Sequence, residues 1–242
     1  MIKSFLDLPK HKKKNDAIFL GSGPSIEQFN PDQWAFIKDN FDVWASNNWI
    51  VNKDIVPDFY HLEVKMHRSG QLMVDMLNLK YESYKEVAWI LDRTRPYLMQ
   101  FINPDYFDNV FLYDKLYRTE ETGTYEVSKD KVSVSCNASL TVILDIMQRM
   151  EYESISFAGV DMTSSKYFWT DNPKYKEYPI PDIMKSCKPD ERPPDSLHPT
   201  FKLKDFIPEF CEFNGIKSYN LSPESLLKER MKTCNLEEII DV

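Results

Sequence analysis

The stretch Ala17-Ile18-Phe19-Leu20-Gly21-Ser22-Gly23-Pro24-Ser25 decides the fold. Its first four residues form a continuous apolar run, which is typical of a strand buried on both faces of a parallel sheet. Two glycines and a proline then favour a tight turn, and residues 25–28 have the spacing of a capping box at a helix start. Because the free N–H groups of a helix start attract anions, the stretch predicts either a phosphate-binding loop or an ordinary strand-to-helix turn.

Buried strand patterns alternate with helical patterns along the rest of the chain. Helices are predicted over 31–41, around 72–77, from Asn137 or Ser139 to 147, over 201–214 with Pro208 as a kink or early end, and after a cap at 222–224. Strands are predicted over 17–20, 42–46, 58–62, 87–91, 109–113, 154–161 and 216–220. This alternation implies an α/β fold with a doubly wound, mostly parallel, Rossmann-like sheet. A length of 242 residues suits one domain, 1–242.

Residues 162–199 differ from the rest of the chain in composition. Seven of the fifteen prolines lie there, so regular structure is not expected. A long irregular segment inside a compact domain is usually a functional lid or is disordered. We therefore predict a lid over 162–199.

The composition excludes several classes of protein. The net charge is −8, from 30 basic and 38 acidic residues, which argues against a nucleic-acid partner. The basic run over 10–14 is interpreted as a solvated flank, with a peripheral membrane contact as the alternative. No apolar stretch suits a membrane span or a signal peptide, and the four cysteines have no ligand spacing. We expect a cytoplasmic protein with reduced thiols and no metal site.

Small or polar residues follow several of the predicted strands. In a doubly wound sheet ligands bind beyond the carboxyl ends of the strands, so these residues are the candidate site. Each group on its own also fits an ordinary turn or cap. The candidates are Gly21, Ser22, Gly23, Pro24, Ser25, Asn47, Asn48, His61-Leu62-Glu63, Gly159 and Asp161, with 220–223 after the last strand.

Taken in order, these elements resemble bacterial lipooligosaccharide sialyltransferases (glycosyltransferase family forty-two) and their flagellin-glycosylation relatives. The shared pattern is strand-Gly-x-Gly-Pro-Ser, a second strand ending in Asn47-Asn48, a capped apolar helix leading to Gly159-Val160-Asp161, a lid, and a histidine. The last element is Asn220-Leu221-Ser222-Pro223-Glu224-Ser225-Leu226-Leu227, with Pro223 25 positions after His198. The resemblance covers roughly residues 17–227, and the middle third of this stretch contains none of the shared motifs.

The resemblance implies a GT-A-like domain that transfers a sugar from a CMP-linked donor to a glycan acceptor with inversion and no cofactor or metal. It implies His198 as the general base, since a histidine holds or releases a proton near neutral pH. Tyr167 would donate to the leaving phosphate. Ser22, Asn47 and Asn48 would contact the nucleotide and donor sugar, and Ser139 and Gly159 would line the nucleotide pocket. Whether the protein forms a homo-oligomer is not determined by the sequence.

Two departures bear on the donor sugar. Thr163 stands where relatives have a second lid tyrosine, and His61 stands where an asparagine touching the donor is expected. Other nucleotide sugars therefore remain alternatives to CMP-sialic acid, for an acceptor in surface polysaccharide or lipopolysaccharide biosynthesis. Archaeal pterin pyrophosphokinases of the MptE-like group share part of the pattern and would need ATP and Mg²⁺, with Glu63, Asp92 and Asp161 as candidate ligands. A non-catalytic nucleotide-binding relative is a third hypothesis.

Overall fold

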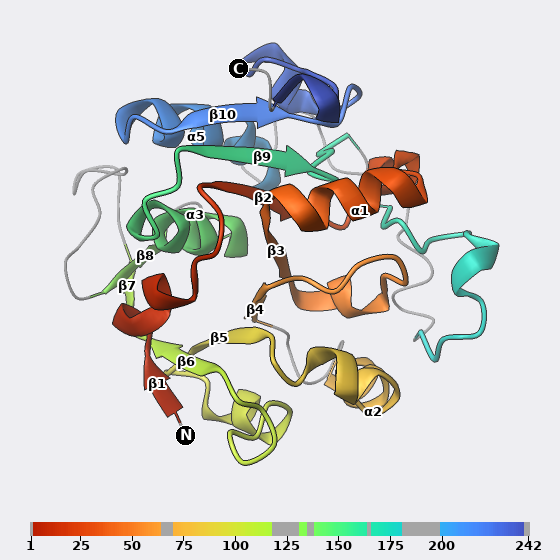
Figure 1. Ribbon diagram of the computed structural model, residues 1–242, viewed down its shortest axis with the longest axis vertical. Coiled ribbons are helices and arrows are strands. Elements are labelled where there is room, and N and C mark those ends of the chain that lie inside the picture. The colour runs from red at the N-terminus through yellow and green to blue at the C-terminus, as the bar shows by residue number, and fades with distance from the viewer. Residues whose placement is uncertain are drawn as a thin grey trace.

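A computed structural model of the chain describes residues 2–63, 70–117, 131–134, 138–163, 166–180 and 199–239. Its centre is an eight-stranded sheet in the order β1-β6-β5-β4-β3-β2-β9-β10 (Figure 1), and every neighbouring pair is parallel. The strands are β1 (Ile2–Ser4), β2 (Asp16–Leu20), β3 (Asp42–Ser46), β4 (Phe59–Leu62), β5 (Ala88–Asp92), β6 (Val110–Tyr113), β9 (Ser154–Ala158) and β10 (Lys217–Asn220). The predicted α/β fold with a parallel, doubly wound sheet is confirmed.

The side of the sheet on which the chain adds new strands changes at β2. From β2 it adds β3, β4, β5 and β6 on one side, and it then returns to place β9 on the other side of β2. Leu20, the last residue of β2, pairs with Ala45 of β3 and with Ala158 of β9. The loops after β2 and β9 therefore meet at the switch point, where doubly wound sheets bind ligands.

Helices cover both faces of the sheet. The helices α1 (Pro31–Asn40) and α2 (Gln71–Tyr84) pack into one apolar core, through residues such as Trp34 and Met76. The helices α3 (Ser139–Arg149) and α5 (Pro199–Phe213) pack into the core on the other face, through residues such as Ile143 and Phe210. Figure 1 shows the two pairs on opposite sides of the sheet.

All seven predicted strands are confirmed, and three short strands were not predicted. β1 extends the sheet beyond β6, while β7 (Lys115–Tyr117) and β8 (Val132–Val134) pair with each other in a separate two-stranded sheet. With three residues each, these strands are too short to show a periodic pattern.

Two local predictions were wrong. Residues 25–28 form no capping box: they belong to a 3₁₀ helix, η2 (Pro24–Gln28), because the Ser25 side chain is bonded elsewhere. The capping box forms at Asn30 and Gln33, at the start of α1. The final helix, η8 (Leu226–Glu229), is a 3₁₀ turn capped by Ser225, not a helix capped at Ser222. Helix α5 runs through Pro208 and begins at Pro199, the last residue of the predicted lid.

Within the predicted lid the structure describes residues 162–163, 166–180 and 199, and the stretch 166–180 is mostly turns with one 3₁₀ helix, η7 (Pro173–Tyr175). It nevertheless packs on the core through Phe168, Trp169 and Tyr175. The Tyr175 hydroxyl donates to Glu27 at 2.7 Å, which joins the lid to η2. The segment is irregular, as predicted, but it is held to the body of the domain.

The lysines of the basic run contact the domain itself. Lys12 Nζ donates to the Glu151 carbonyl at 2.6 Å, Lys14 Nζ donates to the Asp39 carbonyl, and Lys13 pairs with Asp58 at 3.4 Å. Separately, none of the helices in the described ranges has the length and apolar character that a bilayer crossing requires.

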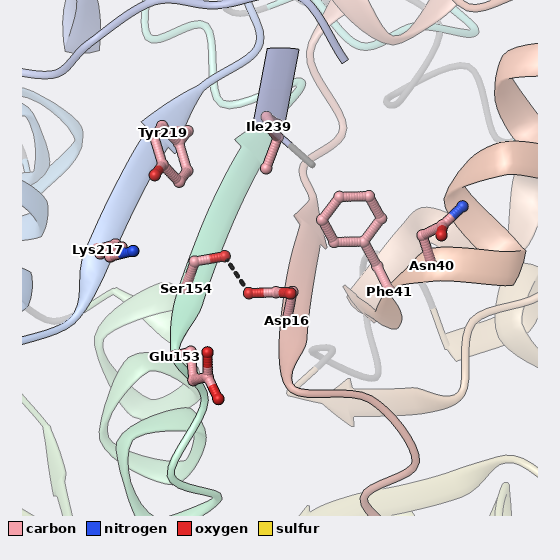
Figure 2. Close-up of a pocket in the computed structure, with 8 residues that line it drawn as sticks. All are labelled: Asp16, Asn40, Phe41, Glu153, Ser154, Lys217, Tyr219 and Ile239. Carbon is pink, nitrogen blue, oxygen red and sulfur yellow. Dashed lines mark hydrogen bonds between the residues drawn. The ribbon is translucent and has the colours of Figure 1, made fainter. Parts of the chain in front are cut away.

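A hollow of about 260 Å³ opens at the amino ends of β2, β9 and β10. Figure 2 shows Asp16 and Ser154 at its floor, where the Ser154 hydroxyl donates to the Asp16 carboxylate at 2.6 Å. Phe41 and Tyr219 line its two sides. This hollow lies at the sheet edge opposite the predicted site, so it is separate from the residues described next.

Candidate active site

The loop after β2 lies directly along the loop after β9. The Gly21 N–H donates to the Ala158 carbonyl at 2.7 Å, and the Gly23 N–H donates to the Gly159 carbonyl at 2.8 Å. A Cβ atom on Gly21 would overlap the Gly159 carbonyl oxygen, and one on Gly23 would overlap the Asp161 carboxylate. The two glycines are therefore required by the close approach of two loops.

The Asp161 side chain binds Ser25, the last residue of the Gly-Ser-Gly-Pro-Ser loop. Its carboxylate accepts from the Ser25 N–H at 2.9 Å and also from the Ser25 hydroxyl. Ser222, in the loop after β10, lies 2.7 Å from the Ser25 hydroxyl and accepts from the Gly159 N–H at 2.9 Å. Three loops at the carboxyl edge are thus fixed to one another, with Pro24 at the start of η2.

Ser22 joins the same loop to the lid. Its carbonyl accepts from the Phe168 N–H at 3.0 Å. The neighbouring Tyr167 ring stacks on Trp169, with the ring centroids 4.4 Å apart. The predicted Tyr167 and Ser22 therefore lie near each other, and Thr163 is exposed at the start of this segment.

Asn47 and Ser139 come together from loops far apart in the sequence. Asn47 follows β3 in a left-handed conformation, with φ of 53°, and its carbonyl accepts from the Tyr60 hydroxyl. Its Nδ2 lies 3.4 Å from the hydroxyl of Ser139, the first residue of α3. Both side chains are partly exposed, so a ligand can reach them. The neighbouring Asn48 has a buried Oδ1 for which the described residues provide no partner.

Glu63 links these two residues. Its N–H donates to Asn47 Oδ1 at 2.8 Å, and its Oε2 accepts from the Ser139 hydroxyl at 2.6 Å. Its other oxygen, Oε1, pairs with Arg95 at 2.9 Å and with Lys115. Glu63 therefore lies between the polar pair and two cations.

The two cations also bind Asp92. Lys115 Nζ lies 2.9 Å and Arg95 Nε 3.4 Å from Asp92 Oδ2, while Asp92 Oδ1 accepts from the Thr94 N–H at 2.9 Å. Two carboxylates and two cations in mutual contact balance their charges. We call Glu63, Asp92, Arg95 and Lys115 the charge cluster.

The surroundings fix the protonation of this region. Burial alone would raise the pKa of Glu63, but the His61 ring and the contacts with Lys115 and Ser139 lower it to about 2. Burial lowers the pKa of His61 to about 4, although the Glu63 carboxylate acts in the opposite direction. At neutral pH Glu63 is ionised and His61 is neutral. His61 is fully buried beneath the site, with Nε2 2.8 Å from the Tyr113 hydroxyl.

These residues do not suit Mg²⁺. Glu63 and Asp92 are each in contact with a lysine and an arginine, and Asp161 is used by Ser25. Hard divalent cations need carboxylate oxygens free to coordinate them. Within the described ranges no group of three or more histidine, cysteine, aspartate or glutamate side chains is placed to hold a metal ion.

Two members of this region were not predicted from the sequence, and the role of a third was predicted differently. Arg95 and Lys115 were not singled out, although each follows a buried strand within three residues. Glu63 was placed among the residues at the strand ends and considered as a metal ligand, but not as the partner of Asn47 and Ser139. The signal available was a charged residue within three positions of the end of a buried strand. His198 lies outside the described residues, and helix α5 begins at the next position.

The fold is similar to that of a solved bacterial sialyltransferase. The structure is similar to that of the monofunctional alpha-2,3-sialyltransferase Cst-I from Campylobacter jejuni, with a TM-score of 0.52 and 14% identity over 92% of this chain and 81% of that one. At this identity the likeness concerns the fold.

Two further solved structures also align. The C. jejuni sialyltransferase CstII, solved with the substrate analogue CMP-3FNeuAc, has a TM-score of 0.49 at 14% identity over 90% of this chain and 84% of that one. A MAf glycosyltransferase from Magnetospirillum magneticum has a TM-score of 0.48 at 14% identity over 93% of this chain and 33% of that one. No family model and no curated protein matches the sequence.

Proposed function

We propose that this protein is a glycosyltransferase that transfers a sugar from a CMP-linked or other nucleotide-sugar donor to a glycan acceptor with inversion. One observation carries the proposal: Asn47 and Ser139, 92 positions apart, lie 3.4 Å from each other. They do so at the ligand-binding edge of a sheet whose fold is similar to that of a sialyltransferase. The resemblance to sialyltransferases implies that Asn47 contacts the nucleotide and donor sugar and that Ser139 lines the nucleotide pocket.

In this proposal the chain's own residues supply the chemistry. Ser22, Asn47, Asn48 and Ser139 bind the donor. Tyr167 donates its hydroxyl to the phosphate that leaves, which stabilises charge as it develops. His198 takes the proton from the acceptor hydroxyl as that oxygen attacks the anomeric carbon and the bond to the phosphate oxygen breaks.

The arrangement around Asp161 supports a positioning role for the Gly-Ser-Gly-Pro-Ser loop. The N–H groups of Gly21, Gly23 and Ser25 donate to the last residue of β9 and to the loop that follows it, so they hold the shape of the edge. The N–H and hydroxyl of Ser22 remain available to the nucleotide-sugar substrate, because no residue in the described ranges forms a hydrogen bond with them. We propose that Ser22 is the residue of this loop that contacts the ligand.

The proposal includes a cytoplasmic enzyme without a metal or other cofactor. The paired state of Glu63 and Asp92 supports metal independence, because a metal would have to displace Lys115 and Arg95. Thermal-shift measurements with CMP, UDP, GDP and ATP, each with and without Mg²⁺, test this part. We expect stabilisation by CMP or another glycosyl-donor nucleotide without Mg²⁺. Stabilisation by ATP only with Mg²⁺ would contradict the proposal and favour a pyrophosphokinase.

Variants of histidine test the reaction. Once a sugar nucleotide is found to be hydrolysed or transferred, His198→Ala should lower turnover at least about a hundredfold and leave nucleotide binding unchanged. His11→Ala is the matched control, because His11 packs on Phe111 near the amino ends of β5 and β6. Equal turnover in the wild-type protein and His198→Ala would remove His198 from the base role.

A further inference from the structure

Glu63 is held at all four of its polar groups. Its N–H donates to Asn47 Oδ1, its carbonyl accepts from Arg95 at 3.2 Å, its Oε1 binds the two cations, and its Oε2 accepts from Ser139. Its side chain is 13% exposed. A carboxylate so fixed has one orientation, and the partners that it binds are oriented with it.

We infer that Glu63 is a positioning residue that makes Ser139 a hydrogen-bond acceptor and Asn47 a hydrogen-bond donor toward the nucleotide. The inference rests on the proposed function and adds to it the chemical class of the group that each residue binds. It follows from the direction of the hydrogen bonds that Glu63 makes.

A hydroxyl has one proton to donate. Ser139 donates its proton to the ionised Glu63 at 2.6 Å, so the Ser139 oxygen can only accept further hydrogen bonds. A ligand group bound there must bring a proton, which selects a ribose hydroxyl or a base amino group. A carboxylate or phosphate oxygen bound there would face the Ser139 oxygen with no proton between the two atoms.

The amide of Asn47 is polarised in the opposite sense. Its Oδ1 is occupied by the Glu63 N–H, and its Nδ2 carries two protons, of which one is directed at Ser139. The second proton is available to an acceptor oxygen of the nucleotide. The ligand must therefore offer a donor at Ser139 beside an acceptor at Asn47.

Asp92 provides a matched control for Glu63. Both carboxylates contact Arg95 and Lys115, so Glu63→Gln and Asp92→Asn each remove one negative charge from the same two cations. Asp92 bonds Thr94, whereas the bonds to Asn47 and Ser139 come from Glu63. A glutamine has both an oxygen and an NH₂ group, so it no longer fixes the direction of the Ser139 hydroxyl.

The experiment compares the binding of CMP, 2′-deoxy-CMP, 3′-deoxy-CMP and UMP to the wild-type protein, Ser139→Ala, Glu63→Gln and Asp92→Asn by titration calorimetry. At least one analogue that lacks a donor should bind the wild-type protein about three- to tenfold more weakly than CMP. That penalty should fall below about twofold in Ser139→Ala and Glu63→Gln and should persist in Asp92→Asn. A change in overall stability alone would not move this ratio.

Three outcomes overturn the inference. The first is equal binding of CMP and all three analogues to the wild-type protein. The second is a penalty that survives in Ser139→Ala or Glu63→Gln, and the third is a penalty that Asp92→Asn also removes. If Glu63→Gln does not fold, Glu63→Asp, which withdraws the carboxylate from Ser139, replaces it with the same expectation. Failure of the wild-type protein to bind CMP overturns the proposed use of CMP as well, whereas CMP binding with unchanged selectivity overturns only the role of Glu63.

Discussion

The Asp161 carboxylate accepts the N–H of Ser25 at 2.9 Å and the hydroxyl of the same residue, across 136 positions of sequence. This contact joins the loops that follow β2 and β9, the two strands on either side of the switch point. The shape of the proposed donor site therefore depends on one side chain that is 7% exposed.

Asp161→Ala should destabilise the protein by about 2–4 kcal/mol, because the Ser25 N–H loses a charged partner in a partly buried place. Ser25→Ala should cost only about 1 kcal/mol, since the N–H keeps its bond to Asp161. Urea unfolding measures both, with the exposed Asp39→Ala as a control expected within about 0.5 kcal/mol of the wild-type protein. Equal free energies of unfolding for Asp161→Ala and Asp39→Ala would contradict the linking role.

Glycine variants separate crowding from backbone conformation. Gly215 has φ of +68°, and a methyl group placed on its Cα would have no heavy atom within 4 Å, so Gly215→Ala should cost only about 1 kcal/mol of left-handed strain. Gly21→Ala would place its methyl group on the Gly159 carbonyl oxygen and should cost about 2–3 kcal/mol. Urea unfolding of both variants gives the comparison. A smaller loss for Gly21→Ala than for Gly215→Ala would show that the two loops can move apart.

The fold was predictable because buried parallel strands consist of continuous runs of apolar residues. Ala17 to Leu20 and Val87 to Leu91 show this pattern, and both became central strands. Edge elements carried no such signal: β1 has only three residues, and its exposed Ile2 resembles any surface position.

The candidate site was predictable only in part, since its contacts are long-range. The sequence places Asn47 and Ser139 at strand and helix ends, but it does not show that Glu63 joins them. Ser25 illustrates the opposite error. Its local spacing to Gln28 favours a capping box, yet the distant Asp161 takes its hydroxyl, because a charged acceptor forms the stronger hydrogen bond.

Removal of one hydroxyl should loosen the lid. In Tyr175→Phe the bond from the Tyr175 hydroxyl to the Glu27 carboxylate, 2.7 Å long, is lost while the buried ring stays, so we expect a destabilisation of about 1–2 kcal/mol. Limited proteolysis should then cleave within 166–180 faster than in the wild-type protein. Tyr178→Phe is the control, because the Tyr178 ring contacts Lys53 at 4.7 Å and that contact survives the change. Identical cleavage rates for the two variants would show that the Tyr175 hydroxyl does not stabilise the lid.

Acid should weaken the fold through His61. Burial lowers the pKa of this fully buried ring from 6.5 to about 4 in the folded protein. The unfolded chain therefore binds the proton first as the pH falls. The contribution of His61 to the free energy of unfolding is complete above pH 6.5 and is lost between pH 6.5 and 4, by up to about 3 kcal/mol.

His61→Gln should show a shallower loss of stability over that interval, as measured by urea unfolding at half-unit pH steps. The comparison with a variant is needed because burial raises the pKa of Asp42 and of Asp145, and protonation of these carboxyl groups acts in the opposite direction. Tyr113→Phe serves as the control: it removes the 2.8 Å partner of His61 Nε2 but keeps the buried ring, so its pH dependence should stay steep. Parallel curves for the wild-type protein and His61→Gln would show that other groups set the acid sensitivity.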